Sequence, residues 1–186
     1  LYGLEATADT LYPTNLPYTD LGLKPYALDL QMARKLLDEA GWTLSGGQRS
    51  KDGKTLETDL CFVGNDAKQK SIAEVLQADL GKVGIKVNLI GEETSAVEER
   101  QRSGNFGLIF GDTWGAPYDP HSFSSSMRAP SHADYQAQIG LPMKAEIDAR
   151  IGAVLVETDD EKRAEQWRWI LTTLHEQAVY LPISYK

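Results

Sequence analysis

The chain has 186 residues, of which 41% are hydrophobic and 25% are charged, a composition typical of a folded protein rather than a disordered one. This length suits one domain or one lobe of a larger protein. The formal net charge of -8 argues against broad binding to nucleic acid or to an anionic membrane, and no apolar run approaches the roughly 20 residues of a membrane helix.

Residues 1–27 are predicted to form an extended, irregular lead-in, because prolines recur along them. A helix should follow, with Asp29 as its N-cap. The apolar face of this helix is expected to consist of Ala33, Leu36, Leu37 and Ala40. Residues 45–54 are rich in turn formers, and Asp52 and Gly53 fit a hairpin tip.

Strands and helices then alternate along the chain. Short strands are predicted at 55–63, 85–90 and 106–110. Between them, apolar residues at helical spacing predict a helix over 66–83, and Thr94 is expected to cap a second helix that ends near Ser103. This alternation favours right-handed crossovers between parallel strands. The expected fold class is therefore α/β, with a mostly parallel sheet flanked by helices.

Helical patterns dominate the last third of the chain. A short helix is expected around Ser122 to Met127, followed by a polar loop that contains His132. Two longer helices and a final apolar strand should follow, at 144–157, 160–177 and 179–184. No polar linker divides this part of the chain, so residues 28–186 are expected to form a single lobe after the lead-in.

The sequence carries no motif that indicates catalysis. A glycine-rich phosphate loop, a nucleophile elbow and a cysteine cluster for zinc are all missing. The single cysteine, Cys61, excludes an internal disulfide bond, and its place in the apolar run LCFV predicts a small, buried hydrophobic residue.

The segment TWGAPYDPH, which follows the third predicted strand, is the first candidate binding element. Ligands of open parallel sheets bind outside the carboxyl ends of the strands. Two prolines stiffen this segment, so Trp114 and Tyr118 would be displayed on a pre-ordered loop, where each ring offers a face for stacking. The alternative, equally open from spacing alone, is that both rings pack over the end of the core.

His132 is the second candidate, because a neutral imidazole in a polar loop can coordinate a metal through one nitrogen. One imidazole alone is a poor metal site, and a surface or capping role is the simpler interpretation. Arg128, four residues earlier, could clamp a carboxylate or form a surface ion pair.

Taken in order, the segments resemble the extracellular solute-binding proteins of peptide and nickel ABC transporters. The resemblance covers nearly the whole chain and is carried by LDLQMARKLLDEAGW, LCFVGNDAKQKSIAEVLQADLGKVGIKVNLIG, SAVEERQRSGNFGLIFGDTWGAPYDP and AVYLPISY. Within this family, TWGAPYDPH followed by SSMRAPSHADYQAQ is most similar to the nickel-binding branch.

The resemblance implies the C-terminal lobe of a type II, two-lobed periplasmic binding protein. Such proteins catch their ligand between two lobes that close about a hinge, and deliver it to the membrane subunits of an ABC permease. The N-terminal lobe would lie outside this sequence, which we therefore expect to be an excised piece of a monomeric receptor. Neither an enzymatic activity nor an intrinsic cofactor is implied.

The resemblance also assigns roles to three residues. Nickel would arrive with a small organic chelator that supplies most of its ligands. His132 would be the one metal-ligating imidazole, and Trp114 and Tyr118 would hold the chelator in the cleft. Imidazole nitrogen is a suitable nickel ligand.

Two other functions stay open from the sequence. The first is a di- or oligopeptide receptor with the same fold. The second is a small hydrolase that uses Asp119, His121 or His132, although no motif places a nucleophile beside these groups.

Overall fold

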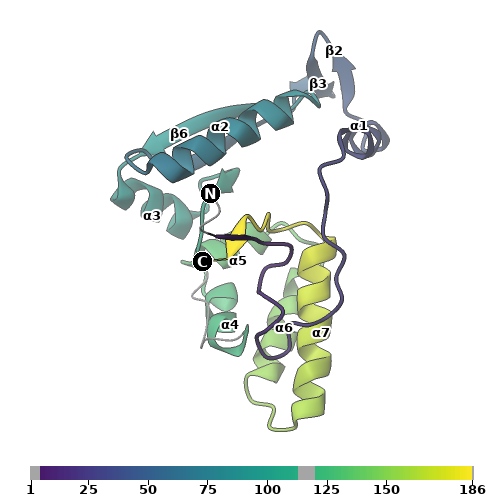
Figure 1. The fold of residues 1–186 in the computed structure, drawn as a ribbon, viewed down its shortest axis with the longest axis vertical. Helices are drawn as coiled ribbons and strands as arrows, with labels where there is room; N and C mark the ends of the chain where they lie inside the picture. The colour runs from purple at the N-terminus through teal and green to yellow at the C-terminus, as the bar shows by residue number, and fades with distance from the viewer. Residues whose placement is uncertain (1–4, 113–119, 186) are drawn as a thin grey trace. The chain divides into compact units, whose positions relative to one another are not determined.

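The computed structural model describes residues 5–112 and 120–185, which form two compact units (Figure 1). Unit 1 joins Leu1–Tyr26 to Asp112–Lys186, and unit 2 is the continuous segment Ala27–Gly111. Each unit has its own hydrophobic core. The division expected from the sequence, a lead-in over 1–27 and a lobe over 28–186, stays a prediction.

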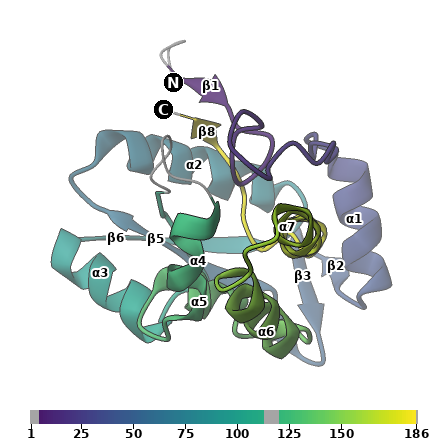
Figure 2. The same ribbon diagram turned by 90° about the horizontal axis from the view of Figure 1, so that it is seen from below.

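Unit 2 is built on a three-stranded sheet with the strand order β6-β5-β7. The central strand, β5 (Glu57–Val63), pairs in parallel with β6 (Lys86–Glu92) and with β7 (Leu108–Ile109). Figure 2 shows helix α2 (Ala67–Gly81) on one side of these strands and helix α3 (Thr94–Ser103) on the other. The predicted α/β fold with a parallel sheet and flanking helices is therefore confirmed.

Strand β5 is buried because helices cover both of its faces. Leu60 and Phe62 belong to a core cluster with Ala73 of α2. Cys61 points the opposite way and is 0% exposed. It is a free thiol whose pKa is raised by burial, so the expected small buried hydrophobic residue is confirmed. An unbroken apolar run such as LCFV is typical of a strand covered on both faces.

Helix α1 (Leu30–Glu39) begins where the sequence predicts. The Asp29 carboxylate accepts hydrogen bonds from two backbone N–H groups of its first turn. The expected apolar face, however, is not buried, since Leu36 is 57% exposed and none of the helix residues is classed as buried. Polar contacts from the buried side chain of Arg49 hold the helix instead. Helical spacing thus predicts the helix correctly but not how it packs.

Arg49 belongs to a small antiparallel sheet formed by β2 (Thr43–Ser45), β3 (Gln48–Lys51) and β4 (Lys54–Thr55). Asp52 and Gly53 connect β3 to β4 with φ angles of 50° and 74°. Positive φ at both central residues is what a type I′ hairpin turn requires. The predicted hairpin tip is therefore confirmed.

The predicted cap of α3 and the predicted length of the third strand are wrong. The N-cap of α3 is Glu93 rather than Thr94, which is the first helical residue, and no side chain caps this helix. The third strand contracts to Leu108–Ile109, because only Leu60 and Cys61 of β5 pair with it. Short edge strands are common, since an edge has a neighbour on one side only.

Gly107, directly before β7, lets the edge strand approach β5 closely. A Cβ atom at this position would lie 1.9 Å from the Thr58 hydroxyl oxygen and 3.0 Å from the Asp59 carbonyl oxygen. We expect Gly107→Ala to displace β7 and to lower the free energy of unfolding of unit 2 by about 2 kcal/mol. Urea unfolding followed by circular dichroism measures this loss. Gly111→Ala is the matched control, because a Cβ there meets no atom of the described residues within 4 Å. Equal stability of the two variants would contradict the prediction.

Unit 1 is mainly helical in its second half. Its helices are α4 (Pro120–Arg128), α5 (Ala133–Gln138), α6 (Lys144–Val154) and α7 (Asp160–Glu176). Helices α6 and α7 lie side by side (Figure 1), and Ile147, Ile151 and Trp167, each 0% exposed, are part of the core. Three of these helices match the prediction, whereas α5 occupies part of the segment predicted as a polar loop.

The predicted final strand over 179–184 is wrong in extent. Strand β8 covers Ser184–Tyr185 and pairs antiparallel with β1 (Ala6–Thr7), so it does not extend the parallel sheet. Pro182 contributes to this result, because proline has no N–H to donate to a strand ladder.

The lead-in of unit 1 packs against α7, and no helix or strand forms over residues 8–29. Its buried residues Tyr12 and Leu16 join the core of unit 1. At its end, the Tyr26 ring stacks on His175 at 4.8 Å between centroids, and His175 Nε2 lies 2.9 Å from the Lys24 carbonyl oxygen. The predicted extended lead-in is thus fixed in place by contacts with the last helix.

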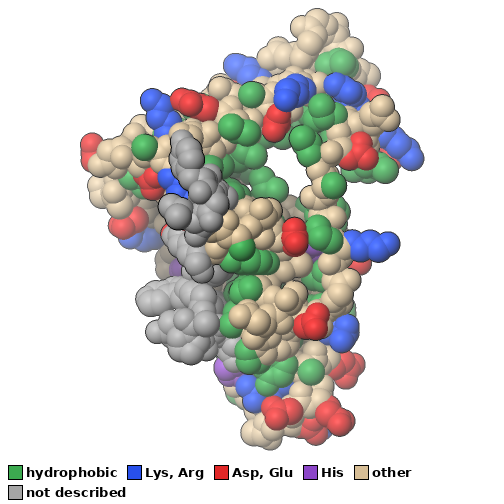
Figure 3. Space-filling view, in the orientation of Figure 1, with side chains coloured by type: hydrophobic (Ala, Val, Ile, Leu, Met, Phe, Trp, Pro, Cys, Tyr) green, Lys and Arg blue, Asp and Glu red, His purple; other side chains and the backbone are tan. Residues whose placement is uncertain are grey.

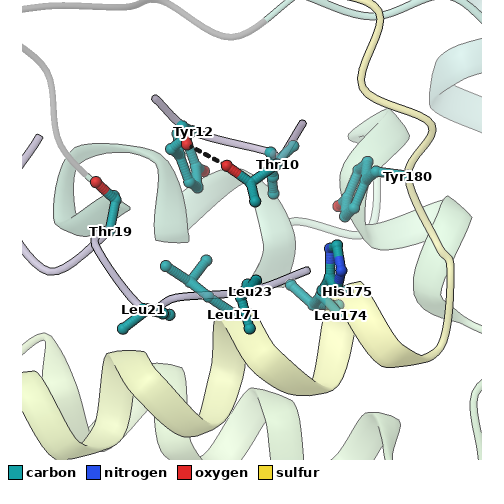
Figure 4. A pocket seen from close by; sticks show the side chains of 10 residues that line it. Thr10, Tyr12, Thr19, Leu21, Leu23, Leu171, Leu174, His175 and Tyr180 are labelled. Atoms are coloured by element: carbon teal, nitrogen blue, oxygen red, sulfur yellow. Dashed lines mark hydrogen bonds between the residues drawn. The ribbon is translucent and has the colours of Figure 1, made fainter. Parts of the chain in front are cut away.

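A shallow pocket lies between the lead-in and α7, with about 390 Å³ of empty space including its open mouth. Figure 4 shows that the side chains around it are mostly apolar, among them Leu21, Leu23, Leu171 and Leu174. The pocket does not include His132.

Within the described residues, no helix is both long enough and apolar enough to cross a bilayer. Side chains of Lys and Arg are interspersed with those of Asp and Glu on the face shown in Figure 3. The described side chains visible on that face therefore form no continuous patch of one charge.

Candidate functional site

The two predicted cleft aromatics, Trp114 and Tyr118, lie in residues 113–119, outside the described residues. Asp112, the last described residue before this segment, lies shortly after the carboxyl end of β7. Their expected role in holding a ligand stays a prediction.

His132 is the N-cap of helix α5, which begins at the next residue. Its Nδ1 accepts a hydrogen bond of 3.2 Å from the backbone N–H of Asp134. The predicted loop therefore ends at His132, and the capping interpretation of this residue is confirmed. Capping does not remove the imidazole from solvent, because its side chain is 51% exposed.

The two ring nitrogens of His132 have different surroundings. Nδ1 faces Asp134, with the backbone nitrogen at 3.2 Å and the carboxylate oxygen Oδ2 at 3.5 Å. Nε2 makes no hydrogen bond to any residue in 5–112 or 120–185. Since Nδ1 accepts a hydrogen bond, the neutral ring carries its proton on Nε2. Nε2 is thus the nitrogen that is open to a partner from outside the described chain.

The carboxylate of Asp134 is held from two other elements of unit 1. The hydroxyl of Ser126 in α4 donates to Oδ2 at 2.5 Å, and the hydroxyl of Tyr180 donates to Oδ1 at 3.2 Å. Burial, and then the negative charge of Asp134, raise the Tyr180 pKa well above its ordinary value. Tyr180 therefore stays a neutral hydroxyl that can donate to the carboxylate.

A second polar group supports Tyr180 from the other side. The side-chain amide of Gln138, which is 0% exposed, donates to the Tyr180 oxygen at 2.8 Å. Buried Lys144 donates to the Met127 carbonyl oxygen at 2.9 Å and to the Asp148 carboxylate at 2.6 Å. Hydrogen bonds of this kind satisfy polar groups that would otherwise be costly to bury. Together they fix the ends of α4, α5 and α6, and with them the position of Asp134.

His121 and Arg128 both contact other helices of unit 1, although Arg128 is exposed, and Asp119 lies outside the described residues. The ring of His121 contacts Trp167 edge-on, with 6.5 Å between centroids, and its buried Nδ1 has no hydrogen-bond partner among the described residues. The guanidinium of Arg128 lies against Gly152 of α6, at 3.5 Å from where a Cβ of that residue would be. Neither contact brings these side chains to His132.

Sequence reasoning places Asp134 beside His132 but missed Ser126 and Tyr180, which hold the Asp134 carboxylate. A local signal exists only for Asp134, because an acidic residue two positions after an N-cap is common at helix starts. Tyr180 is 46 positions away from Asp134, and no local pattern predicts that contact. Among the described residues, no three His, Cys, Asp or Glu side chains form a group that could hold a metal ion.

The fold and the sequence together define the class of protein. Residues 1–135 match the family described as bacterial extracellular solute-binding proteins, family 5 Middle. The chain therefore belongs to this family of binding proteins, which are not enzymes. The resemblance inferred from the sequence motifs is confirmed, and the hydrolase hypothesis is set aside.

Two relatives show which members of the family the chain is similar to. The chain is 56% identical over 187 residues to the nickel-binding periplasmic protein of Escherichia coli strain K12, a match that covers 100% of this chain and 36% of that protein. The crystal structure of NikA from Brucella suis in complex with Fe(III)-EDTA is 60% identical with a TM-score of 0.94, and covers 99% of this chain and 37% of that one.

The fold extends to more distant proteins. The oligopeptide-binding protein AppA from Bacillus subtilis, in complex with a nonapeptide, has a TM-score of 0.79 at 22% identity, covering 100% of this chain and 37% of AppA. At this identity the likeness concerns the fold alone. The chain spans a little over a third of the length of all three relatives.

Proposed function

We propose that the chain is the C-terminal lobe of a periplasmic receptor that captures nickel, as a complex with a small organic chelator, for an ABC transporter. The observation that carries this proposal is the 56% identity, over the whole chain, with a nickel-binding periplasmic protein. The NikA structure with Fe(III)-EDTA supports the view that such proteins take a metal inside an organic chelate.

Nε2 of His132 is the protein's ligand to the nickel in this proposal. The geometry supports it, since the side chain is 51% exposed and Nε2 bonds no described residue, while Nδ1 is engaged by Asp134. The chelator supplies most of the other donors, so a single imidazole is sufficient. Imidazole binds divalent nickel well.

Trp114 and Tyr118 hold the organic part of the ligand in this proposal. Large rings on a segment with two prolines lose little conformational entropy on binding. They would contact the carbon atoms of the chelator, which the metal-ligating imidazole does not contact. The missing N-terminal lobe closes the opposite side of the cleft, and the membrane subunits of the permease receive the ligand. The receptor acts as a monomer, binds no nucleic acid and holds no cofactor of its own.

The test uses the complete two-lobed receptor and nickel–L-histidine as the probe. We expect His132→Ala to lower the affinity by about 100-fold or more, because loss of a metal ligand should cost at least as much as the ~10–100-fold typical of its supporting residues. Isothermal titration calorimetry gives the two dissociation constants.

His175→Gln is the control, since His175 on α7 hydrogen-bonds to the Lys24 carbonyl oxygen of the lead-in, and its replacement should leave the affinity unchanged. Unchanged affinity in His132→Ala would remove His132 from the mechanism. Mass spectrometry of the ligand that co-purifies with the receptor tests the ligand class, and bound oligopeptides without metal would favour a peptide receptor instead.

A further inference from the structure

Two roles of His132 compete for the same nitrogen. As the cap of α5, the ring uses the lone pair of Nδ1 to accept the Asp134 backbone N–H, and the ring proton is on Nε2. As a neutral metal ligand through Nε2, the ring must carry its proton on Nδ1. A protonated Nδ1 cannot accept a hydrogen bond, so the cap observed here and metal binding exclude each other.

Nδ1 does not offer a second route to the metal. The backbone nitrogen of Asp134 lies 3.2 Å from it and the carboxylate oxygen Oδ2 lies 3.5 Å from it. A metal at Nδ1 would have to displace both groups. Nε2 bonds none of the described residues, so a metal there displaces no such group.

The structure already contains the group that can accept a hydrogen bond from a protonated Nδ1. Oδ2 of Asp134 is only slightly farther from Nδ1 than the backbone nitrogen is, so a small rotation of the ring exchanges one for the other. Ser126 and Tyr180 fix this carboxylate from α4 and from the segment before β8. Its side chain is 28% exposed, which limits competition from water.

We propose that Asp134 is the positioning residue of His132: when Nε2 binds the metal, the Asp134 carboxylate accepts the hydrogen bond from Nδ1–H. The ring loses a proton at Nε2 and gains one at Nδ1, so its proton count does not change. Asp134 thereby sets the ring orientation and increases the basicity of Nε2, as carboxylates do behind many metal-bound histidines. This inference rests on the proposed function.

The affinity of the complete receptor for nickel–L-histidine is the first measurement. Asp134→Ala should bind about 10–100-fold more weakly than the wild type, the range typical of residues that support a metal ligand. Asp134→Asn should lose less, because its amide oxygen can still accept from Nδ1–H. Binding by Asp134→Ala within about twofold of the wild type, or an equal loss in both variants, would overturn the proposal.

Gln136→Ala is the control for general loosening of the loop. Its side chain, on the same helix α5, donates to the Pro130 carbonyl oxygen at 2.6 Å rather than to the imidazole. We expect its affinity to stay within about twofold of the wild type. A loss as large as that of Asp134→Ala would assign the effect to loop order and would sink the positioning role.

The second measurement follows the proton itself by ¹⁵N nuclear magnetic resonance of the His132 ring in the complete receptor. Zinc–L-histidine serves as a diamagnetic probe. The free receptor should show the proton on Nε2 and the loaded receptor should show it on Nδ1. A loaded receptor in which Nδ1 remains unprotonated would contradict the exchange, whatever the affinities are.

The outcomes separate this inference from the proposed function. If the wild type does not bind nickel–L-histidine, or His132→Ala binds as well as the wild type, the proposed function fails and the positioning role fails with it. If His132→Ala weakens binding while Asp134→Ala does not, the receptor function stands and only the positioning role is lost.

Discussion

The 186-residue chain alone should bind nickel–L-histidine at least about 1000-fold more weakly than the complete two-lobed receptor does, a difference of about 4 kcal/mol. Binding sites for small ligands typically bury about 70–90% of the ligand surface. One lobe would supply His132 and one wall of the cleft, so the ligand would stay partly hydrated. Isothermal titration calorimetry on both proteins under the same conditions measures the difference.

A folded state of the isolated chain has to be established first, by far-ultraviolet circular dichroism and by a cooperative thermal transition. Nickel without chelator is titrated in parallel, because exposed carboxylates and imidazoles can bind the free ion weakly. An affinity of the folded chain within tenfold of that of the complete receptor would contradict a cleft shared by two lobes.

Arg49→Met should lower the free energy of unfolding of unit 2 by at least about 3 kcal/mol. The Arg49 side chain is 2% exposed and donates to the Val83 and Trp42 carbonyl oxygens and to the Asp38 carboxylate. Each hydrogen bond from a charged donor contributes about 1.5–3 kcal/mol, and methionine replaces none of them while keeping most of the buried volume. Urea unfolding monitored by circular dichroism gives the free energy.

Lys51→Met is the matched control for Arg49→Met. Lys51 lies on the same strand and donates to a single carbonyl oxygen, that of Ala40, but it is exposed, so its loss should cost about 0.5 kcal/mol. Amide hydrogen exchange adds a local test, because the Arg49 side chain reaches the residues of α1. Retained protection of α1 together with a stability loss below about 1 kcal/mol would refute the role assigned to Arg49.

Much of unit 2 could be predicted because its signals are local. Asp29 and Asp66 each accept two backbone N–H groups at the start of a helix, a role that a single residue type and its position indicate. Asp52 and Gly53 adopt the turn that their backbone preferences favour. The run LCFV is typical of a strand covered on both faces.

The failures concern contacts between residues far apart in the sequence. Arg49 stands in a polar, turn-rich segment, where an arginine is normally solvated, yet carbonyl groups of other elements surround it. The apolar stripe of α1 predicts burial, but Leu36 remains exposed. Periodicity shows which face of a helix is apolar and does not show whether another element covers it.

The candidate site also combines a residue that the sequence could indicate with contacts that it could not. His132 could be selected from the sequence only through the resemblance to nickel-binding relatives, because a lone histidine carries no spacing signal. Its cap role depends on the short helix α5, which has too few residues to show periodicity. The Asp134 to Tyr180 hydrogen bond joins two segments whose proximity depends on the packing of unit 1.

Cys61, the only cysteine of the chain, gives unit 2 an intrinsic chemical reporter. The thiol lies at the centre of β5 with no exposed surface, and its raised pKa keeps it in the unreactive protonated form. A thiol-specific reagent can label it only when the strand opens. The labelling rate of Cys61 therefore reports how often this unit opens, and ligand titration during labelling shows whether ligand binding changes the opening of the sheet.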